Sequence, residues 1–134
     1  MRILVTGFEP FGGDSINASQ EVLKVLPEVI GGHTIHKLIF PVTFAHAIER
    51  MNVAITHYRP DLVVCLGQSV GRREITLERV AINLQDAPIP DNAGEQPVDR
   101  PVMVGGPAAF HVTLNRESQR RLPSLPTRRR RLSR

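Results

Sequence analysis

The chain has 134 residues, a formal net charge of +4 and a single cysteine. This length fits one domain with one core. No stretch approaches the roughly 20 apolar residues of a membrane span, and no signal peptide is recognisable at the start. A lone cysteine excludes an internal disulfide and suits a reducing compartment. We therefore expect a cytoplasmic protein that does not insert into membranes.

The charge is unevenly distributed along the chain. Residues 1–115 carry nine Lys and Arg against twelve Asp and Glu, a net of −3, whereas residues 116–134 carry eight Arg against one Glu, a net of +7. A change of this kind marks a boundary. We expect a folded segment, 1–115, and an Arg-rich tail, 116–134, whose lack of apolar periodicity predicts disorder.

Two interpretations of the tail remain open. Residues 128–131 are four consecutive arginines, which is typical of segments that bind nucleic acid non-specifically, although no aromatic residue is interleaved for base stacking. The alternative is a GC-rich coding frame read out of register, which yields mainly Arg, Pro, Ser, Leu and Ala codons. In that case the tail has no function of its own.

Strands and helices alternate in the predicted fold. Apolar runs predict strands near 2–6, 35–40, 61–66 and 77–83, a short edge strand at 102–104 and an extended stretch over 110–114. Helical spacing predicts helices near 18–26 and 44–58, with Asn17 and Gln20 forming a capping box and Thr43 capping the second helix. This order is typical of an α/β domain with a mainly parallel sheet.

Cys65 is expected to be a small core residue in a buried strand. No histidine, lysine or helix N-terminus lies near it in the sequence to lower the pKa of its thiol. Four histidines lack metal-like spacing with cysteine or carboxylates and are expected to be structural or at the surface: His33, His36, His46 and His57. The sequence therefore predicts neither a metal nor a cofactor.

Glu78 and the pair Phe8 and Phe11 are the candidate functional residues, each with a structural alternative. Glu78 is one acid in an apolar, β-branched stretch that follows a glycine-containing loop, which is where α/β enzymes place catalytic groups. The pattern alone favours the alternative, a surface carboxylate paired with Arg79 or Arg72. The two phenylalanines lie in a loop too aromatic for a plain solvent-facing one, and they could simply fold onto the core.

Three segments resemble the pyroglutamyl peptidase type I family, whose members are cytosolic cysteine peptidases that remove an N-terminal pyroglutamate. Residues 67–68 with 75–83 (GQ and ITLERVAIN) resemble the family's glutamate signature. Residues 7–13 (GFEPFGG) resemble its N-terminal motif, and residues 89–92 (IPDN) leading to 106–110 (GPAAF) fit as well. The resemblance runs in order from Met1 to about Leu114.

The resemblance implies a role for each candidate residue. Phe8 and Phe11 would form the apolar walls around the flat pyroglutamyl ring, Asn17 would help hold the pocket loop, and Gln68 would lie at the pocket's edge. Glu78 would orient a catalytic histidine, as the third member of other triads does. N-terminal pyroglutamyl peptides are the implied partners, and a homo-oligomer is compatible with the family.

The resemblance also implies a three-layer α/β/α fold with a mainly parallel, mixed sheet that is incomplete at its C-terminus. The family's nucleophile lies in a Gly-Thr-aromatic-Val-Cys-Asn context, and no such string occurs in these 134 residues. We therefore expect this chain to be inactive as a peptidase. The alternative is a pseudoenzyme that binds pyroglutamyl ligands, or a protein that binds nucleic acid through its tail.

Overall fold

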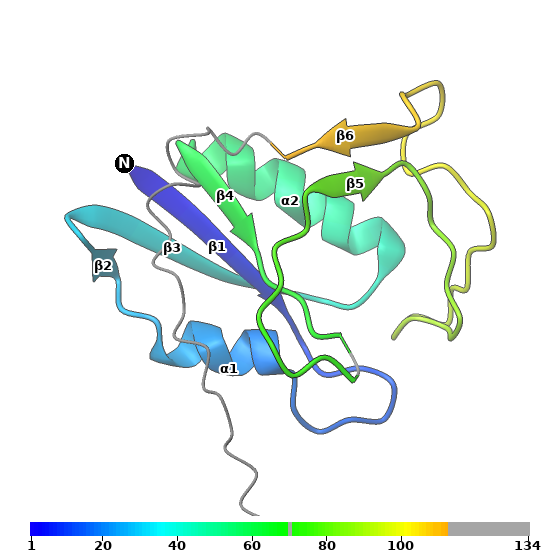
Figure 1. Cartoon of the computed structure of the whole chain (residues 1–134), viewed down its shortest axis with the longest axis horizontal. Coiled ribbons are helices and arrows are strands. Elements are labelled where there is room, and N and C mark those ends of the chain that lie inside the picture. Colours follow the sequence, from blue (N-terminus) through cyan, green and yellow to red (C-terminus); the bar gives the residue numbers. More distant parts are fainter. Residues whose placement is uncertain (70, 113–134) are drawn as a thin grey trace, which may run out of the picture. The chain divides into compact units, whose positions relative to one another are not determined.

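The computed structural model describes residues 1–69 and 71–112, which form two compact units (Figure 1). The first unit comprises Met1–Ile75 and Leu84–Val102, and the second comprises Thr76–Asn83 and the chain from Met103 onward. The predicted disorder of residues 116–134 lies outside the described residues. Each unit is described by itself below.

A four-stranded mixed sheet organises the first unit. Its order is β2-β3-β1-β4, with β1 (Arg2–Phe8) parallel both to β3 (His33–Phe40) and to β4 (Leu62–Cys65). The short β2 (Val29–Ile30) runs antiparallel to β3. The central position of β1 brings the chain that follows it to the carboxyl edge of the sheet, where parallel α/β folds place their sites.

The two helices of the first unit cover opposite faces of the sheet. On one face, α1 (Ala18–Val25) contributes Leu23 to a core with Val5 and Ile35. Side chains alternate along a strand, so Phe8 of β1 points to the other face, where it lines a cavity together with residues of α2 (Phe44–Tyr58). Figure 1 shows α2 passing behind the sheet. This is the predicted α/β/α arrangement.

Most predicted elements of the first unit are confirmed. Both helices and the strands near 2–6 and 35–40 are present, with bounds that differ by two residues at most. β2 was not predicted, although Gly31 and Gly32, both with positive φ, form the two-residue connection that a tight hairpin requires. The predicted edge strand at 102–104 is wrong, because residues 102–105 form bends and a turn.

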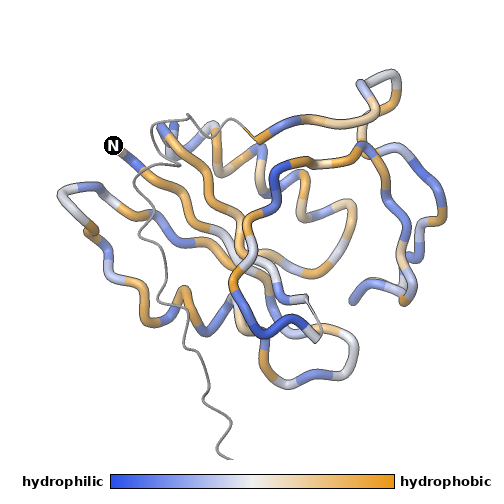
Figure 2. The backbone as a smooth tube through the Cα atoms, in the orientation of Figure 1, coloured by the Kyte–Doolittle hydropathy of each residue, from blue (hydrophilic) through white to orange (hydrophobic). Residues whose placement is uncertain are grey.

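The predicted burial of β4 is wrong, and so is the predicted burial of Cys65. Figure 2 shows β4 to be as hydrophobic as β1, yet Leu62 and Val64 are each 36% exposed and Cys65 is exposed. The reason is its place in the sheet. Among the described residues β4 pairs only with β1 and forms an edge, so its side chains lack neighbours on one flank.

The described part of the second unit contains one two-stranded antiparallel sheet. β5 (Val80–Ile82) pairs with β6 (Ala109–His111), with Ala81 opposite Phe110. β5 is shorter than the predicted strand at 77–83. The side chain of Asn83 fixes the chain beyond it by donating to the Met103 carbonyl at 2.8 Å and accepting from the Met103 N–H at 2.7 Å.

Within the described residues, no helix is both long enough and apolar enough to cross a membrane.

Candidate functional site

Residues 8–13, which comprise the last residue of β1 and the loop after it, are the centre of the candidate site and are called the aromatic loop below. Phe8 is half-buried, and its ring lies edge-on to Phe40 of β3, with a centroid distance of 6.3 Å and an interplanar angle of 83°. Phe11 is also half-buried, and its carbonyl accepts from the Asp14 N–H at 3.1 Å, closing a turn. The aromatic partner of Phe8 in the structure is thus Phe40.

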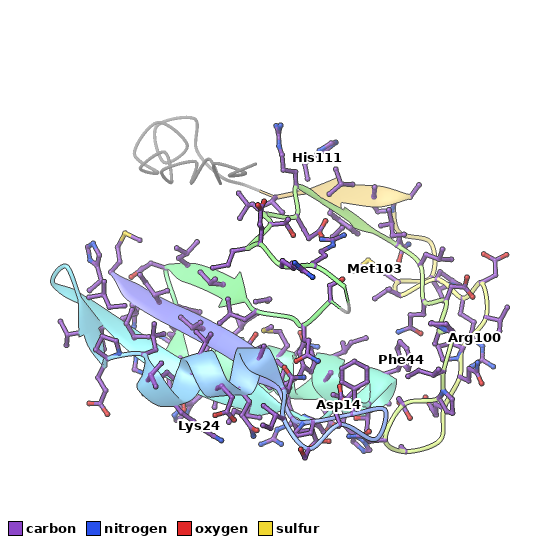
Figure 3. All side chains as sticks on the ribbon, turned by 60° about the horizontal axis from the view of Figure 1, so that its bottom comes forward. Asp14, Lys24, Phe44, Arg100, Met103 and His111 are labelled. Carbon is purple, nitrogen blue, oxygen red and sulfur yellow. The ribbon has the colours of Figure 1, made fainter. Side chains whose placement is uncertain are left out.

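A cavity of about 330 Å³ opens beside Phe8 on the face of the sheet covered by α2. Its lining is mainly apolar, and Asp91 is its one charged member. The remaining lining residues are Val42, Thr43, Phe44, Ala47, Ile48, Leu84, Gln85 and Val102. Figure 3 labels Phe44, whose ring projects from the first turn of α2. Phe11, Asn17 and Gln68 do not line this cavity.

Asp91 acts as a remote cap for α2. Thr43 occupies the N-cap position but makes no side-chain capping bond, and the Phe44 N–H instead donates to Asp91 Oδ2 at 2.9 Å. Burial opposes ionisation of Asp91, but backbone N–H groups of Phe44, Glu95, Ala93 and Gly94 outweigh it and lower the pKa of this carboxyl. The cavity is therefore bordered by a fixed negative charge at neutral pH.

Asn17 is the N-cap of α1, as predicted, and it also ties the helix to the aromatic loop. It is 1% exposed. Its Oδ1 accepts from the Ser19 N–H at 3.0 Å and the Ser19 Oγ–H at 2.7 Å, and its Nδ2 donates to the Glu9 carbonyl at 3.0 Å. Ser19 Oγ in turn accepts from the Phe8 N–H at 2.9 Å. The cap bond goes to Ser19 and not to Gln20 as the expected capping box requires.

Gln68 also contacts the start of α1. Its Oε1 accepts from the Ala18 N–H at 2.7 Å, and its Nε2 donates to Asp14 Oδ2 at 3.4 Å. The structure thus brings Phe8, Asn17 and Gln68 together where β1 and β4 end and α1 begins. Figure 3 labels Asp14 in the loop that leads to this helix.

Glu78 belongs to the second unit, where it precedes β5 by two residues and is exposed. It therefore lies in the connection before the strand and not within it. Its side chain or backbone has an interaction partner in the structure.

Glu9, Asp91 and Asn92 are site residues to which sequence reasoning assigned no role. Asn92 Nδ2 donates to Glu9 Oε1 at 2.9 Å and to the Pro10 carbonyl at 3.0 Å. The only sequence signal for this contact was the presence of both segments among the recognised motifs. Within the described residues, no group of three or more His, Cys, Asp or Glu side chains is arranged to hold a metal ion.

Comparison with known proteins assigns this chain to a family. The family model "Pyroglutamyl peptidase" matches residues 1–120. A pyrrolidone-carboxylate peptidase of Yersinia pestis is 50% identical over 114 residues, which are 84% of this chain and 53% of that protein.

Solved structures agree with the sequence match. The pyrrolidone carboxyl peptidase of Pyrococcus furiosus superposes with a TM-score of 0.81 at 40% identity, over 85% of this chain and 55% of that one. For the pyroglutamyl peptidase I of Bacillus amyloliquefaciens the TM-score is 0.79 at 44% identity, over 82% and 53% of the two chains. This chain thus spans about half the length of the relatives it matches. It belongs to the pyroglutamyl peptidase family.

Proposed function

We propose that residues 1–115 recognise an N-terminal pyroglutamyl group, the recognition half of a reaction that removes pyroglutamate from peptides. The observation that carries the proposal is the position of Phe8, which lines an apolar cavity of about 330 Å³ at the carboxyl edge of the sheet. A cavity of this size can accept a small flat lactam. The family membership of the chain supports the same ligand.

Each residue has a defined part in the proposal. Phe8 forms an apolar wall for the ring, whereas the second wall assigned to Phe11 rests on the family resemblance, because Phe11 does not line the cavity. Asn17 holds the aromatic loop through Glu9, and Gln68 offers polar atoms at the edge of the site. Glu78 supplies the carboxylate that orients a histidine base. The cytoplasm is the proposed compartment, and association with a second copy is compatible with the proposal.

The chemistry we assign to the family site is acyl transfer. A cysteine thiolate attacks the amide carbonyl between pyroglutamate and the next residue, and a histidine takes the thiol proton and returns it to the leaving amine. Water then hydrolyses the thioester to release pyroglutamate. Glu78 acts only by holding the histidine in place, so it has no catalytic power without that partner.

We propose that these 134 residues by themselves bind without hydrolysis. Their one cysteine, Cys65, is the last residue of β4, and no histidine nitrogen forms a hydrogen bond with its sulfur among the described residues. A thiol needs a base within roughly 2.6–3.2 Å to become an efficient nucleophile.

The test compares binding with turnover in the same preparation. Calorimetric titration with pyroglutamyl-alanine should give saturable binding, whereas prolyl-alanine, which lacks the lactam carbonyl, should bind more weakly. Phe8→Ala should weaken binding of the pyroglutamyl peptide by roughly tenfold or more, since an aromatic wall is removed. Equal affinity for both peptides would refute the proposal.

Turnover is followed by release of a fluorophore from a pyroglutamyl conjugate. We expect no release above that of buffer. Release that is abolished by a thiol alkylator and by Cys65→Ser would instead make Cys65 the nucleophile.

A further inference from the structure

Glu9 makes four hydrogen bonds, and the proposed recognition by Phe8 and Phe11 gives this residue no role. Its N–H donates to the Phe40 carbonyl at 3.0 Å, and its own carbonyl accepts from Asn17 Nδ2 at 3.0 Å. Its side-chain Oε1 accepts twice, from the Val42 N–H at 3.2 Å and from Asn92 Nδ2 at 2.9 Å. Glu9 is half-buried, and it stands directly after Phe8 in the chain. The residue next to Phe8 is thus held by hydrogen bonds to the end of β3 and the residues after it, to the start of α1 and to Asn92.

Asn92 completes the arrangement from a distant part of the first unit. Besides its bond to Glu9, its Nδ2 donates to the Pro10 carbonyl at 3.0 Å, and its N–H donates to the Val42 carbonyl at 2.9 Å. Asn92 therefore holds the aromatic loop through its side chain and the connection between β3 and α2 through its backbone N–H. That connection supplies Val42 to the cavity lining.

The segment around Asn92 also lies near the aromatic loop at a second place, Gly12. A Cβ added to Gly12 would lie 3.4 Å from Ile89 Cδ1, so the Ile89 side chain leaves little room for a larger residue at position 12. Asp91, next to Asn92, holds the first turn of α2 through the Phe44 N–H. Residues 89–92 thus touch the loop and the helix that together border the cavity.

The donors that meet the Glu9 carboxylate are both uncharged. No lysine, arginine or histidine forms a salt bridge with Glu9 among the described residues. Both bonds go to the same oxygen, Oε1. A glutamine at this position can offer an oxygen at the same place, so the geometry of the contact depends on the acceptor and not on the charge.

We infer that Glu9 is a positioning residue, which acts with Asn92 to hold the aromatic loop in the conformation that directs Phe8 into the cavity. The inference rests on the proposed function for the identity of the ligand. The positioning itself rests on the contacts of Glu9, Val42 and Asn92. Glu9 does not touch the ligand in this arrangement; it fixes the backbone from which a ligand-binding ring projects.

The test uses the full chain and three variants at position 9 or 92. Glu9→Gln keeps the acceptor and should bind pyroglutamyl-alanine within about threefold of the parent. Glu9→Ala removes the acceptor and should weaken binding by roughly tenfold or more. Asn92→Asp replaces the donor with an anion facing Glu9 Oε1 and the Pro10 carbonyl, and should weaken binding at least as much. Glu49→Ala, which removes an exposed carboxylate of α2, is the matched control and should change nothing.

Amide hydrogen exchange separates positioning from general stability. In Glu9→Ala the Val42 amide should lose protection, since its acceptor is gone, while the amides of β1 keep theirs. Equal loss of protection at Val42 and throughout β1 would show a general stabilising role and overturn the inference. Unchanged affinity and unchanged protection at Val42 would overturn it as well.

The same experiment distinguishes this inference from the proposed function. Suppose that the parent chain does not bind pyroglutamyl-alanine, but that Glu9→Ala lowers the exchange protection of the Val42 amide and leaves that of the β1 amides unchanged. The ligand assignment then fails and the positioning role stands. If the parent binds and Glu9→Ala binds equally well, the ligand assignment stands and the positioning role fails. A double variant, Glu9→Ala with Asn92→Ala, should lose little more affinity than Glu9→Ala alone, because the two residues act through one contact.

Discussion

Two parallel strands of the first unit, β1 and β4, have similar apolar sequences and different environments. Leu4 in β1 is 0% exposed, whereas Leu62 in β4 is 36% exposed. β1 is paired on both sides, by β3 and by β4, while β4 is paired on one side among the described residues. Burial of a strand is thus decided by its neighbours in the sheet, and an apolar run gives only the capacity to be buried.

Shortening the same side chain in each strand tests this contrast most strongly. Leu4→Ala should lower the free energy of unfolding by about 2–5 kcal/mol, because it leaves a cavity in the sheet's centre. Leu62→Ala should cost about 1 kcal/mol or less, since its side chain is partly in water already. Urea unfolding of both variants is the measurement. Equal costs would mean that β4 is buried in solution, for instance by self-association.

The glycines near the ends of these strands, Gly7 and Gly67, offer a second contrast. Substitution by alanine should lower the free energy of unfolding at one of them and leave it unchanged or raise it at the other. A Cβ on Gly7 would lie 2.9 Å from the Ser19 carbonyl oxygen, so Gly7→Ala should cost about 1–3 kcal/mol. Nothing lies within 4 Å of a Cβ on Gly67, so Gly67→Ala should be neutral or stabilising by up to about 1 kcal/mol. The measurement is the thermal unfolding of both variants beside that of the parent chain. Destabilisation by Gly67→Ala would point to an unrecognised neighbour at the end of β4.

The thiol of Cys65 reports on β4 without any change of sequence. Because it is exposed, it should react with a disulfide reagent such as Ellman's in the native protein, before unfolding begins. Cys65→Ser should change the free energy of unfolding by less than about 1 kcal/mol. A thiol that reacts only above the unfolding transition would restore the original expectation of a core cysteine.

The smallest expected effect on stability is that of Asp61, which precedes β4 and bonds to the first residue of β1. The Arg2 N–H donates to Asp61 Oδ2 at 2.7 Å. This bond lowers the pKa of Asp61, against burial, and the charges of Arg2 and the N-terminal amine lower it further. Its stabilising contribution is therefore complete above the ordinary Asp pKa of about 3.9 and is lost as pH falls through the lowered folded value. The stability difference between parent and Asp61→Asn should be constant near neutral pH and vanish in acid. A difference that grows in acid would contradict this assignment.

Local pattern was sufficient for much of the fold. The apolar spacing and the N-cap residue predicted α1 and α2, and runs of β-branched residues predicted β1 and β3. The cap at Asn17 was predictable because an N-cap acts on residues two or three positions away. The family's motifs predicted that the aromatic loop is part of the site, and this stays a prediction.

Contacts between distant segments were not predictable from local pattern. Asp91 caps α2 from 47 residues away, so nothing near Thr43 indicates that the cap is supplied from elsewhere. The exposure of Cys65 depends on the sheet order, which apolar runs do not encode. The roles of Glu9 and Asn92 are of the same kind, because each residue is ordinary in its own surroundings and acquires a role only when the other is beside it.

The distance along the chain between those two residues has a consequence for folding. Glu9 and Asn92 are separated by 83 residues, so their contact closes one of the longest loops of the first unit. Contacts of this separation form late, after local helices and short-range pairings have reduced the entropy of closure. During synthesis β1 and α1 emerge long before Asn92 does. The aromatic loop is therefore completed near the end of folding, and a refolding chain should acquire helical signal before it acquires ligand affinity.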